Sequence, residues 1–181
     1  TLKEENDKRA GASKMEAAQK ELIKTVLALP HDTMFSIVFY SGGPFAWKNE
    51  LVVANAQNKI DAVTIIGKQG PSTSTNIYDS LEMAMKMVPQ KNPKKPAKEV
   101  GGTSSFSEQL GGADTIFLLT DGIPNEGKIA EPNLILAEIK KINATRHIII
   151  NTIGVGGAGA IDESFLKSLA SENGGTFVNV K

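Results

Sequence analysis

Residues 115–122 read Thr-Ile-Phe-Leu-Leu-Thr-Asp-Gly, an apolar run that ends in a carboxylate and a glycine. Consecutive apolar residues are typical of a parallel strand that is buried on both faces. Asp121 then emerges at the carboxyl edge of the sheet, which is where open α/β folds bind their ligands. A second polar group delivered to that edge would make a binding site.

Apolar residues recur at helical spacing in five other segments. Ser13 begins a capping-box pattern, Pro30 ends that first helix, and Asp162 caps the last one. We expect helices in residues 13–29, 57–68, 77–88, 131–142 and 162–173. Segments rich in β-forming residues predict further strands at 34–40, 51–54, 148–153 and 176–180. This alternation predicts an α/β fold with a mostly parallel sheet that helices cover on both faces.

The composition excludes several classes of protein. The 181 residues contain 20 basic and 20 acidic side chains, and this balance removes the electrostatic footprint of a nucleic-acid-binding protein or a polybasic membrane surface. The lack of cysteine excludes disulfides, thiolate zinc sites and cysteine nucleophiles. No run approaches about 18 apolar residues, so we predict no membrane span. We therefore expect the partners to be proteins or small ligands.

The length of the chain suits one domain, which we place over residues 1–181. Residues 89–114 break the alternation with a run rich in lysine and proline, followed by glycines and serines. We interpret this segment as a long loop or insertion within the domain.

Three loops lead toward the carboxyl edge of the predicted sheet: 41–44, 72–76 and 120–124. The second loop is rich in hydroxyl groups, and the third contains Asp121. Hydroxyl and carboxylate oxygens are the ligands that a hard cation such as Mg²⁺ needs, with water in its remaining octahedral positions. Thr75 and Asp121 therefore predict half of a metal site.

Six segments of the chain together follow the pattern of a known family. They are Lys14-Met15-Glu16-Ala17-Ala18, Phe39-Tyr40-Ser41, Ser74-Thr75-Asn76-Ile77-Tyr78-Asp79-Ser80-Leu81, Leu118-Leu119-Thr120-Asp121-Gly122-Ile123-Pro124-Asn125, Ile153-Gly154-Val155-Gly156 and Gly174-Gly175. In these segments the chain resembles the von Willebrand factor type A family. The resemblance covers nearly the whole chain in the right order, apart from residues 89–114, and it is the combination that is specific.

The resemblance implies a Rossmann-like, three-layer α/β/α sandwich with a metal-ion-dependent adhesion site at the carboxyl edge of its sheet. In the family, the threonine that corresponds to Thr75 binds the cation directly, and the aspartate that corresponds to Asp121 binds it directly or through water. A carboxylate of the partner protein often completes the shell, because a divalent ion held by few protein charges stays electrophilic. The cation would be Mg²⁺ or Mn²⁺. The implied partner-binding rim consists of Asn76, Tyr78, Gly122 and Asn125.

One element of the family pattern is absent. The family's leading motif, Asp-x-Ser-x-Ser, ends its first, central strand, and nothing before the predicted helix of residues 13–29 fits that motif. Asp7-Lys8-Arg9 does not match it, and Ser13 is interpreted as a helix cap. The metal site is therefore only partly represented. A sheet without its middle strand would expose backbone polar groups and apolar helix faces, so we expect the chain to be a fragment of a longer one.

A nucleotide-binding enzyme of the Rossmann type is the main alternative. Gly154, Gly156 and Gly159 fit the pattern G-x-G-x-x-G directly after a predicted strand. That fingerprint needs a helix that opens among the glycines and an acidic residue about 20 positions later, at the end of the next strand. Here the helix cap is Asp162, and the next strand ends at Lys181. The context therefore favours a plain loop.

A hydrolase built on Asp121 or Ser41 is the second enzymatic alternative. The sequence contains no Gly-x-Ser-x-Gly elbow, and His31 and His147 both precede predicted strands, which places them at the opposite, amino edge of the sheet. No base and nucleophile converge on Asp121. We therefore expect a non-enzymatic module that binds another protein, in part through an acidic side chain of that protein.

Overall fold

A computed structural model describes residues 2–90, 111–156 and 161–180, with side chains from Met15 onward. The described helices are α1 (Leu2–Ala28), α2 (Ala56–Ile66), α3 (Ile77–Met85), α5 (Pro132–Asn143) and α6 (Glu163–Glu172). The described strands are β1 (Met34–Phe35), β2 (Val38–Tyr40), β3 (Pro44–Ala46), β4 (Val52–Val53), β5 (Thr115–Thr120), β6 (Ile149–Val155) and β7 (Phe177–Val180). Most of the predicted insertion at residues 89–114, from 91 to 110, lies outside the described residues.

The first helix is longer than the sequence pattern predicts. Helix α1 begins at Leu2 and runs without a break through residue 13, so the prediction that Ser13 is its N-cap is wrong. Residues 3–10 contain Lys, Glu, Arg and Ala, which lose little side-chain freedom in a helix, and this propensity favours the extension. In the part of the chain that the structure describes, no helix combines the length and apolar character needed to cross a membrane.

The parallel sheet consists of β5, β6 and β7, in that order. Phe117 of β5 lies opposite Asn151 of β6, and Ile153 of β6 lies opposite Val178 of β7. On one face of β5 Leu118 is buried in the core, whereas on the other face Phe117 is 57% exposed. The prediction that β5 is buried on both faces is therefore wrong for one face, because that face borders an open cavity next to α1.

Residues 34–40 form two short strands instead of the single predicted strand. β1 pairs antiparallel with β4, and β2 pairs antiparallel with β3 across the turn at residues 41–43. Between β1 and β2 the Ser36 hydroxyl donates to the Lys48 carbonyl (2.8 Å). This side-chain hydrogen bond lies between the two backbone ladders. The two pairs form an antiparallel ribbon that does not share a ladder with β5 among the described residues.

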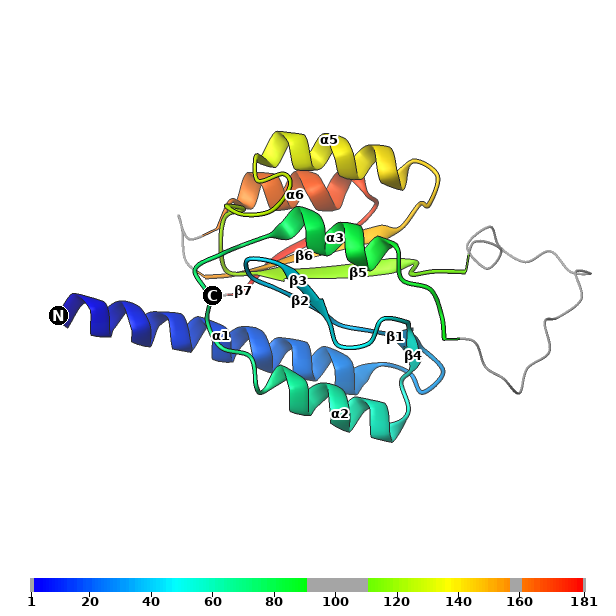
Figure 1. Ribbon diagram of the computed structural model, residues 1–181, viewed down its shortest axis with the longest axis horizontal. Coiled ribbons are helices and arrows are strands. Elements are labelled where there is room, and N and C mark those ends of the chain that lie inside the picture. Colours follow the sequence, from blue (N-terminus) through cyan, green and yellow to red (C-terminus); the bar gives the residue numbers. More distant parts are fainter. Residues whose placement is uncertain (1, 91–110, 157–160, 181) are drawn as a thin grey trace, which may run out of the picture.

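Helices cover the strands from both sides. Helices α3, α5 and α6 lie on one side of the sheet, and α1 and α2 lie on the other (Figure 1). One core cluster packs the first group against β5 and β6, and it includes Leu81 and Ile139. A second cluster joins α1, α2, β1 and β4 around Val26 and Ile66. The predicted three-layer α/β/α sandwich is confirmed.

Thr152 on β6 offers a test of how a buried hydroxyl joins the sheet to α6. Its side chain is fully buried, and its hydroxyl donates to the Leu166 carbonyl (2.8 Å). Thr152→Val keeps the shape but removes the donor, so we expect the free energy of unfolding to fall by about 1 kcal/mol in urea titrations. Thr115→Val at an exposed position of β5 is the control, and an equal loss there would contradict this explanation.

Candidate functional site

Two loops at the carboxyl edge of the sheet are joined by hydrogen bonds. Residues 72–76 lead into α3, and residues 121–125 follow β5. The side chain of Asn125 accepts from the Thr75 N–H (2.7 Å) and donates to the Thr73 carbonyl (3.1 Å). The backbone N–H of Asn125 in turn donates to the Thr75 carbonyl (3.1 Å). These bonds hold the Thr75 loop against the loop that carries Asp121.

Thr75 lies directly against Gly122. A Cβ atom at Gly122 would come within 2.9 Å of the Thr75 hydroxyl oxygen, so the glycine leaves the space that the hydroxyl occupies. Thr75 is 9% exposed, whereas the neighbouring Asp121 is exposed to solvent. The structure thus brings the two predicted metal ligands to adjacent loops, with a nearly buried threonine on one and an exposed aspartate on the other.

Two residues of the implied partner-binding rim lie inside the protein. Asn76 is 1% exposed and Tyr78 is 8% exposed. The Asn76 side chain accepts from the Asp79 N–H (3.2 Å) at the start of α3 and donates to the Gly42 carbonyl (3.2 Å). Tyr78 packs in the core cluster. This is a correction to the implied rim, because a buried cap and a core ring present no surface to a partner.

The preference of asparagine for the N-cap position of a helix is a signal that could have identified the role of Asn76. Gly122 and Asn125 are the residues of the implied rim that remain beside Asp121 at the surface. Asn125 is exposed, although its side chain is already engaged with residues 73–75.

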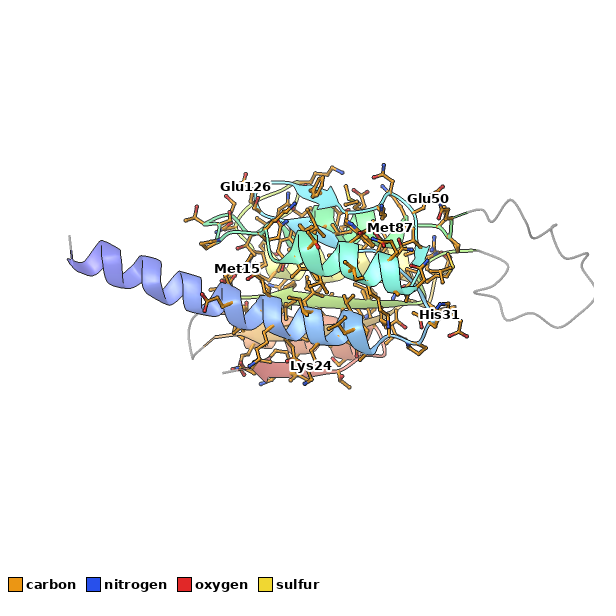
Figure 2. The ribbon with its side chains drawn as sticks, turned by 90° about the horizontal axis from the view of Figure 1, so that it is seen from below. Met15, Lys24, His31, Glu50, Met87 and Glu126 are labelled. Carbon is orange, nitrogen blue, oxygen red and sulfur yellow. The ribbon has the colours of Figure 1, made fainter. Side chains whose placement is uncertain are left out.

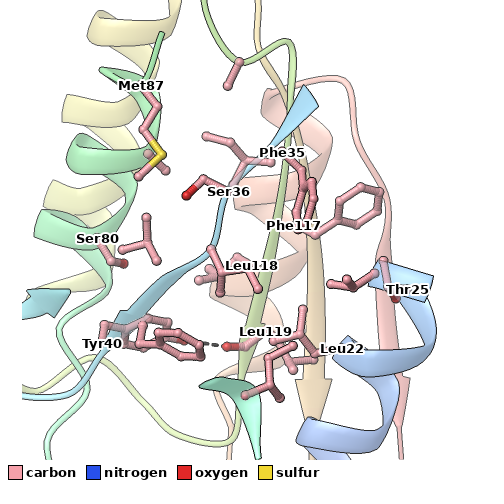
Figure 3. A pocket seen from close by; sticks show the side chains of 18 of the residues that line it. Leu22, Thr25, Phe35, Ser36, Tyr40, Ser80, Met87, Phe117, Leu118 and Leu119 are labelled. Carbon is pink, nitrogen blue, oxygen red and sulfur yellow. Dashed lines mark hydrogen bonds between the residues drawn. The ribbon is translucent and has the colours of Figure 1, made fainter. Parts of the chain in front are cut away.

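Tyr40 is a residue at this edge that was not predicted to belong to the site. Its hydroxyl donates to the Leu119 carbonyl (2.6 Å) across a separation of 79 residues (Figure 3). Burial of the hydroxyl raises the pKa of Tyr40, a hydrogen bond with the Thr120 side chain acts against this, and the Asp121 carboxylate raises it further. Tyr40 therefore stays protonated and acts as a hydrogen-bond donor next to the site. No local pattern could have predicted so distant a contact.

A charged cluster lies on the outer side of α3. Lys128 bridges Glu82 (2.7 Å) and Asp79 (3.8 Å), and Lys86 also contacts Glu82 (2.9 Å). Hydrogen bonds from Lys128 and then Lys86 lower the pKa of Glu82. One carboxylate oxygen of Asp79 is buried without a hydrogen-bond partner in the described structure. The positive charge of Lys128, 3.8 Å from this oxygen, offsets the cost of burying it. We interpret this cluster as a structural tie between α3 and the 121–128 loop.

The oxygen donors at the carboxyl edge suit a cation that keeps several water ligands better than one that is fully coordinated by protein side chains. Among the described residues, no three His, Cys, Asp or Glu side chains converge to hold a metal ion. Thr75 contributes a hydroxyl and Asp121 one accessible carboxylate. Mg²⁺ commonly keeps several waters and binds through only one or two carboxylates. The chemistry of the two donors is therefore compatible with Mg²⁺, with several positions left to water or to another ligand.

The glycines of the nucleotide-binding alternative have roles in packing. A Cβ atom at Gly154 would collide with the Ile161 side chain, so this glycine allows β6 to approach the segment before α6. The Gly156 N–H donates to the Val180 carbonyl (3.0 Å) and is not directed at a ligand. Gly159 lies outside the described residues. Asp162 accepts from the Phe165 N–H (2.9 Å) and caps α6, as predicted.

The histidines lie away from the site. Figure 2 places His31 at the opposite end of the molecule from Glu126, which follows Asn125 in the loop. His147 is exposed and stands before β6, at the amino edge of the sheet. A histidine base next to Asp121 is therefore not part of the described site.

Comparisons with known proteins agree with this architecture. The family model described as the von Willebrand factor type A domain matches residues 8–181. Inter-alpha-trypsin inhibitor heavy chain H2 of Sus scrofa is 30% identical over 156 residues, which are 86% of this chain and 15% of that protein. Heavy chain H4 of Bos taurus is 30% identical over 166 residues, which are 90% of this chain and 16% of that protein. This chain thus spans only a small part of the length of these relatives.

A solved structure shows the same fold at low identity. The von Willebrand factor type A protein from Catenulispora acidiphila superposes with a TM-score of 0.69 at 18% identity, and the match covers 92% of this chain and 34% of that one. At this identity the likeness concerns the fold alone. Together with the match over residues 8–181, it shows that the chain belongs to the von Willebrand factor type A domain family, whose members are typically protein-interaction modules.

Proposed function

We propose that this domain binds a partner protein at the carboxyl edge of its sheet, through a divalent cation held by Thr75 and Asp121. The observation that carries the proposal is the pairing of the nearly buried Thr75 with the exposed Asp121 on two loops that are hydrogen-bonded together. Loops fixed in this way present their oxygens without a large loss of conformational entropy on binding. Gly122 and Asn125 form the adjoining surface.

The proposed cation is Mg²⁺ or Mn²⁺, and the proposed partner contributes an acidic side chain to it. Thr75 is neutral and Asp121 carries one negative charge, so the bound ion would retain a net positive charge. Such an ion attracts a further carboxylate in place of a water molecule. We propose a binding role without catalysis, in keeping with the protein-interaction modules that are typical of this family.

Calorimetric titration of Mg²⁺ and Mn²⁺ into the 181-residue chain tests the proposal. We expect a saturable heat of binding, and we expect Asp121→Ala to weaken the affinity at least tenfold because it removes the only charge among the two ligands. Thr75→Ala should weaken it as well, with the fold retained by circular dichroism. Asp114→Ala is the matched control, since Asp114 is exposed at the opposite end of β5.

The variants distinguish binding of the cation at the proposed site from nonspecific attraction to the charge of the protein. Equal loss of binding in Asp114→Ala and Asp121→Ala would show that the cation responds only to net charge. A folded chain that binds neither cation would contradict the metal-dependent mode of partner binding.

A further inference from the structure

A pocket of about 510 Å³ lies between α3 and β3. In Figure 1, α3 lies beside the hairpin that β2 and β3 form. Pockets that bind small molecules usually measure about 300–1,000 Å³, so this pocket has room for one long side chain or a small molecule. Thr75 and Asp121 do not line it, which makes it separate from the proposed cation site.

One side of α3 forms a wall of the pocket. The residues on that side follow the spacing i, i+3, i+4 and i+7, and they are Asp79, Glu82, Met83 and Lys86. Lys128, from the loop after β5, adds a second cation. These charged side chains, two acidic and two basic, give the wall of the pocket no net charge.

The charges of the pocket are arranged by depth. The side chains of Asp79 and Glu82 are 16% and 21% exposed, whereas those of Lys86 and Lys128 are 70% and 65% exposed. The carboxylates therefore lie toward the floor of the pocket, and the ammonium groups lie at its rim. An occupant meets negative charge inside the pocket and positive charge at the entrance.

Asp79 has unused capacity to accept a hydrogen bond. One of its carboxylate oxygens accepts from the Asn76 side chain (2.9 Å) and from the Lys128 N–H (3.3 Å). The other oxygen is buried and has no hydrogen-bond donor among the described residues. The Lys128 ammonium lies 3.8 Å from it, which is longer than an N–H···O hydrogen bond. A cationic group that enters the pocket would supply the missing donor.

Apolar side chains line the remainder of the pocket. Met83 and Met87 contribute thioether chains on the side of α3, and Pro44 and Ala46 of β3 line the opposite side. Methionine is flexible and polarizable, so it adapts to the shape of an occupant. Long basic side chains commonly lay their methylene groups along apolar surface of this kind.

We propose that this pocket binds a lysine or arginine residue at the carboxyl terminus of another polypeptide. The side-chain cation of that residue reaches the carboxylates of Asp79 and Glu82 on the floor. Its methylene groups lie along Met83. Its α-carboxylate stays at the rim, where it faces the ammonium groups of Lys86 and Lys128.

The balance of charge favours this occupant over others. A carboxyl-terminal basic residue brings one positive and one negative charge, so the neutral pocket stays neutral when it is filled. A free lysine carries an additional α-ammonium group, which would lie against the lysines of the rim. Lys86 and Lys128 now pair with Glu82, and they exchange this partner for the α-carboxylate. Ion pairs of exposed lysines contribute little to stability, so the exchange is not costly.

Titration of the ¹⁵N-labelled 181-residue chain with Nα-acetyl-lysine, followed by NMR, tests the proposal. We expect saturable chemical-shift changes that are centred on residues 79–87. Nα-acetyl-lysine amide keeps the cation and loses the carboxylate, so we expect it to bind about fivefold more weakly or worse. Free lysine should also bind more weakly. Binding should persist in EDTA and in Asp121→Ala, which separates this pocket from the proposed cation site.

Glu82→Gln keeps the shape of the side chain and removes a charge from the floor, so we expect the affinity for Nα-acetyl-lysine to fall by about fivefold or more. Glu138→Gln on α5 is the matched control, because Glu138 is also a helix-surface glutamate with a lysine partner, Lys141. It should bind like the parent chain. The dispersion of the NMR spectrum checks that both variants fold.

Three results would overturn the proposal. Equal affinity for Nα-acetyl-lysine and its amide would show that the carboxylate is not recognised. An equal loss of affinity in Glu82→Gln and Glu138→Gln would show that the ligand responds only to net charge. A folded chain whose signals from residues 79–87 do not shift would show that the pocket does not take this class of ligand, and tighter binding of free lysine would assign the pocket to the free amino acid.

Discussion

Gly175→Ala is expected to lower the free energy of unfolding by at least about 3 kcal/mol, which is a large part of the stability of a typical domain. A Cβ atom at Gly175 would lie 2.5 Å from the carbonyl carbon of Ile150, closer still to its oxygen, and 3.0 Å from the backbone nitrogen of Asn151. These atoms belong to β6, which pairs with both β5 and β7. They cannot withdraw without breaking the ladder.

Gly43→Ala is the control for this result, since nothing lies within 4 Å of a Cβ atom built there. Its effect on stability should stay below about 1 kcal/mol, because the change acts mainly on the unfolded chain. Urea denaturation followed by circular dichroism measures both variants. Similar stabilities for the two would show that the loop after α6 can move away from β6, which the close backbone contact argues against.

Asn143→Asp is expected to cost at least about 3 kcal/mol at pH 7, although the two side chains have nearly the same shape. The buried Asn143 amide donates to the Ile148 carbonyl and to the Asn173 side-chain oxygen, at 2.7 Å each. It also accepts from the Ile148 N–H (2.7 Å). A carboxylate keeps the accepted bond but places a negative charge against two oxygens.

The loss in Asn143→Asp should depend on pH. Burial and the two facing oxygens raise the pKa of the introduced carboxyl in the folded state above its unfolded value of about 3.9. The folded state then prefers the protonated form, so the penalty is smallest below that value and grows as the pH rises toward the folded pKa. Urea titrations of the variant and the parent chain at pH 4 and pH 7 measure this difference.

Asn49→Asp, at an exposed loop position, is the matched control and should change stability by less than about 0.5 kcal/mol at either pH. A penalty in Asn143→Asp that is the same at both pH values would contradict protonation of a buried carboxyl. It would instead point to loss of the two donated hydrogen bonds as the whole cause.

An open cavity between β5 and residues 35–40 explains why the two-sided burial predicted for β5 fails on one side. The apolar run of residues 115–120 predicted a strand correctly, because consecutive apolar side chains are the mark of a strand within a parallel sheet. Phe117 is nevertheless 57% exposed, because its side chain borders the open cavity next to α1. A sequence pattern records which faces are suited to burial, and the neighbouring elements decide whether they are buried.

At the candidate site, too, the sequence predicted some features correctly and the tertiary structure decided others. Thr75 and Asp121 were predicted as neighbours because both follow from the position of loops at one sheet edge, and their loops do lie together. Asn76 and Tyr78 were assigned to the rim by position in the sequence, yet they point into the protein. Tyr40 was not predicted to belong to the site, since its contact with Leu119 spans 79 residues.

The sequence by itself determined the order and type of most elements, the family, and the loops that meet at the carboxyl edge. These properties depend on local periodicity, caps and turn residues, which act over a few positions of the chain. Only the tertiary structure decided that residues 34–40 divide into two strands, that Asn76 is buried, and that a groove lies between β5 and that ribbon. Each of these depends on contacts between segments far apart in the chain, whose free energy is set by packing and by which backbone groups find partners.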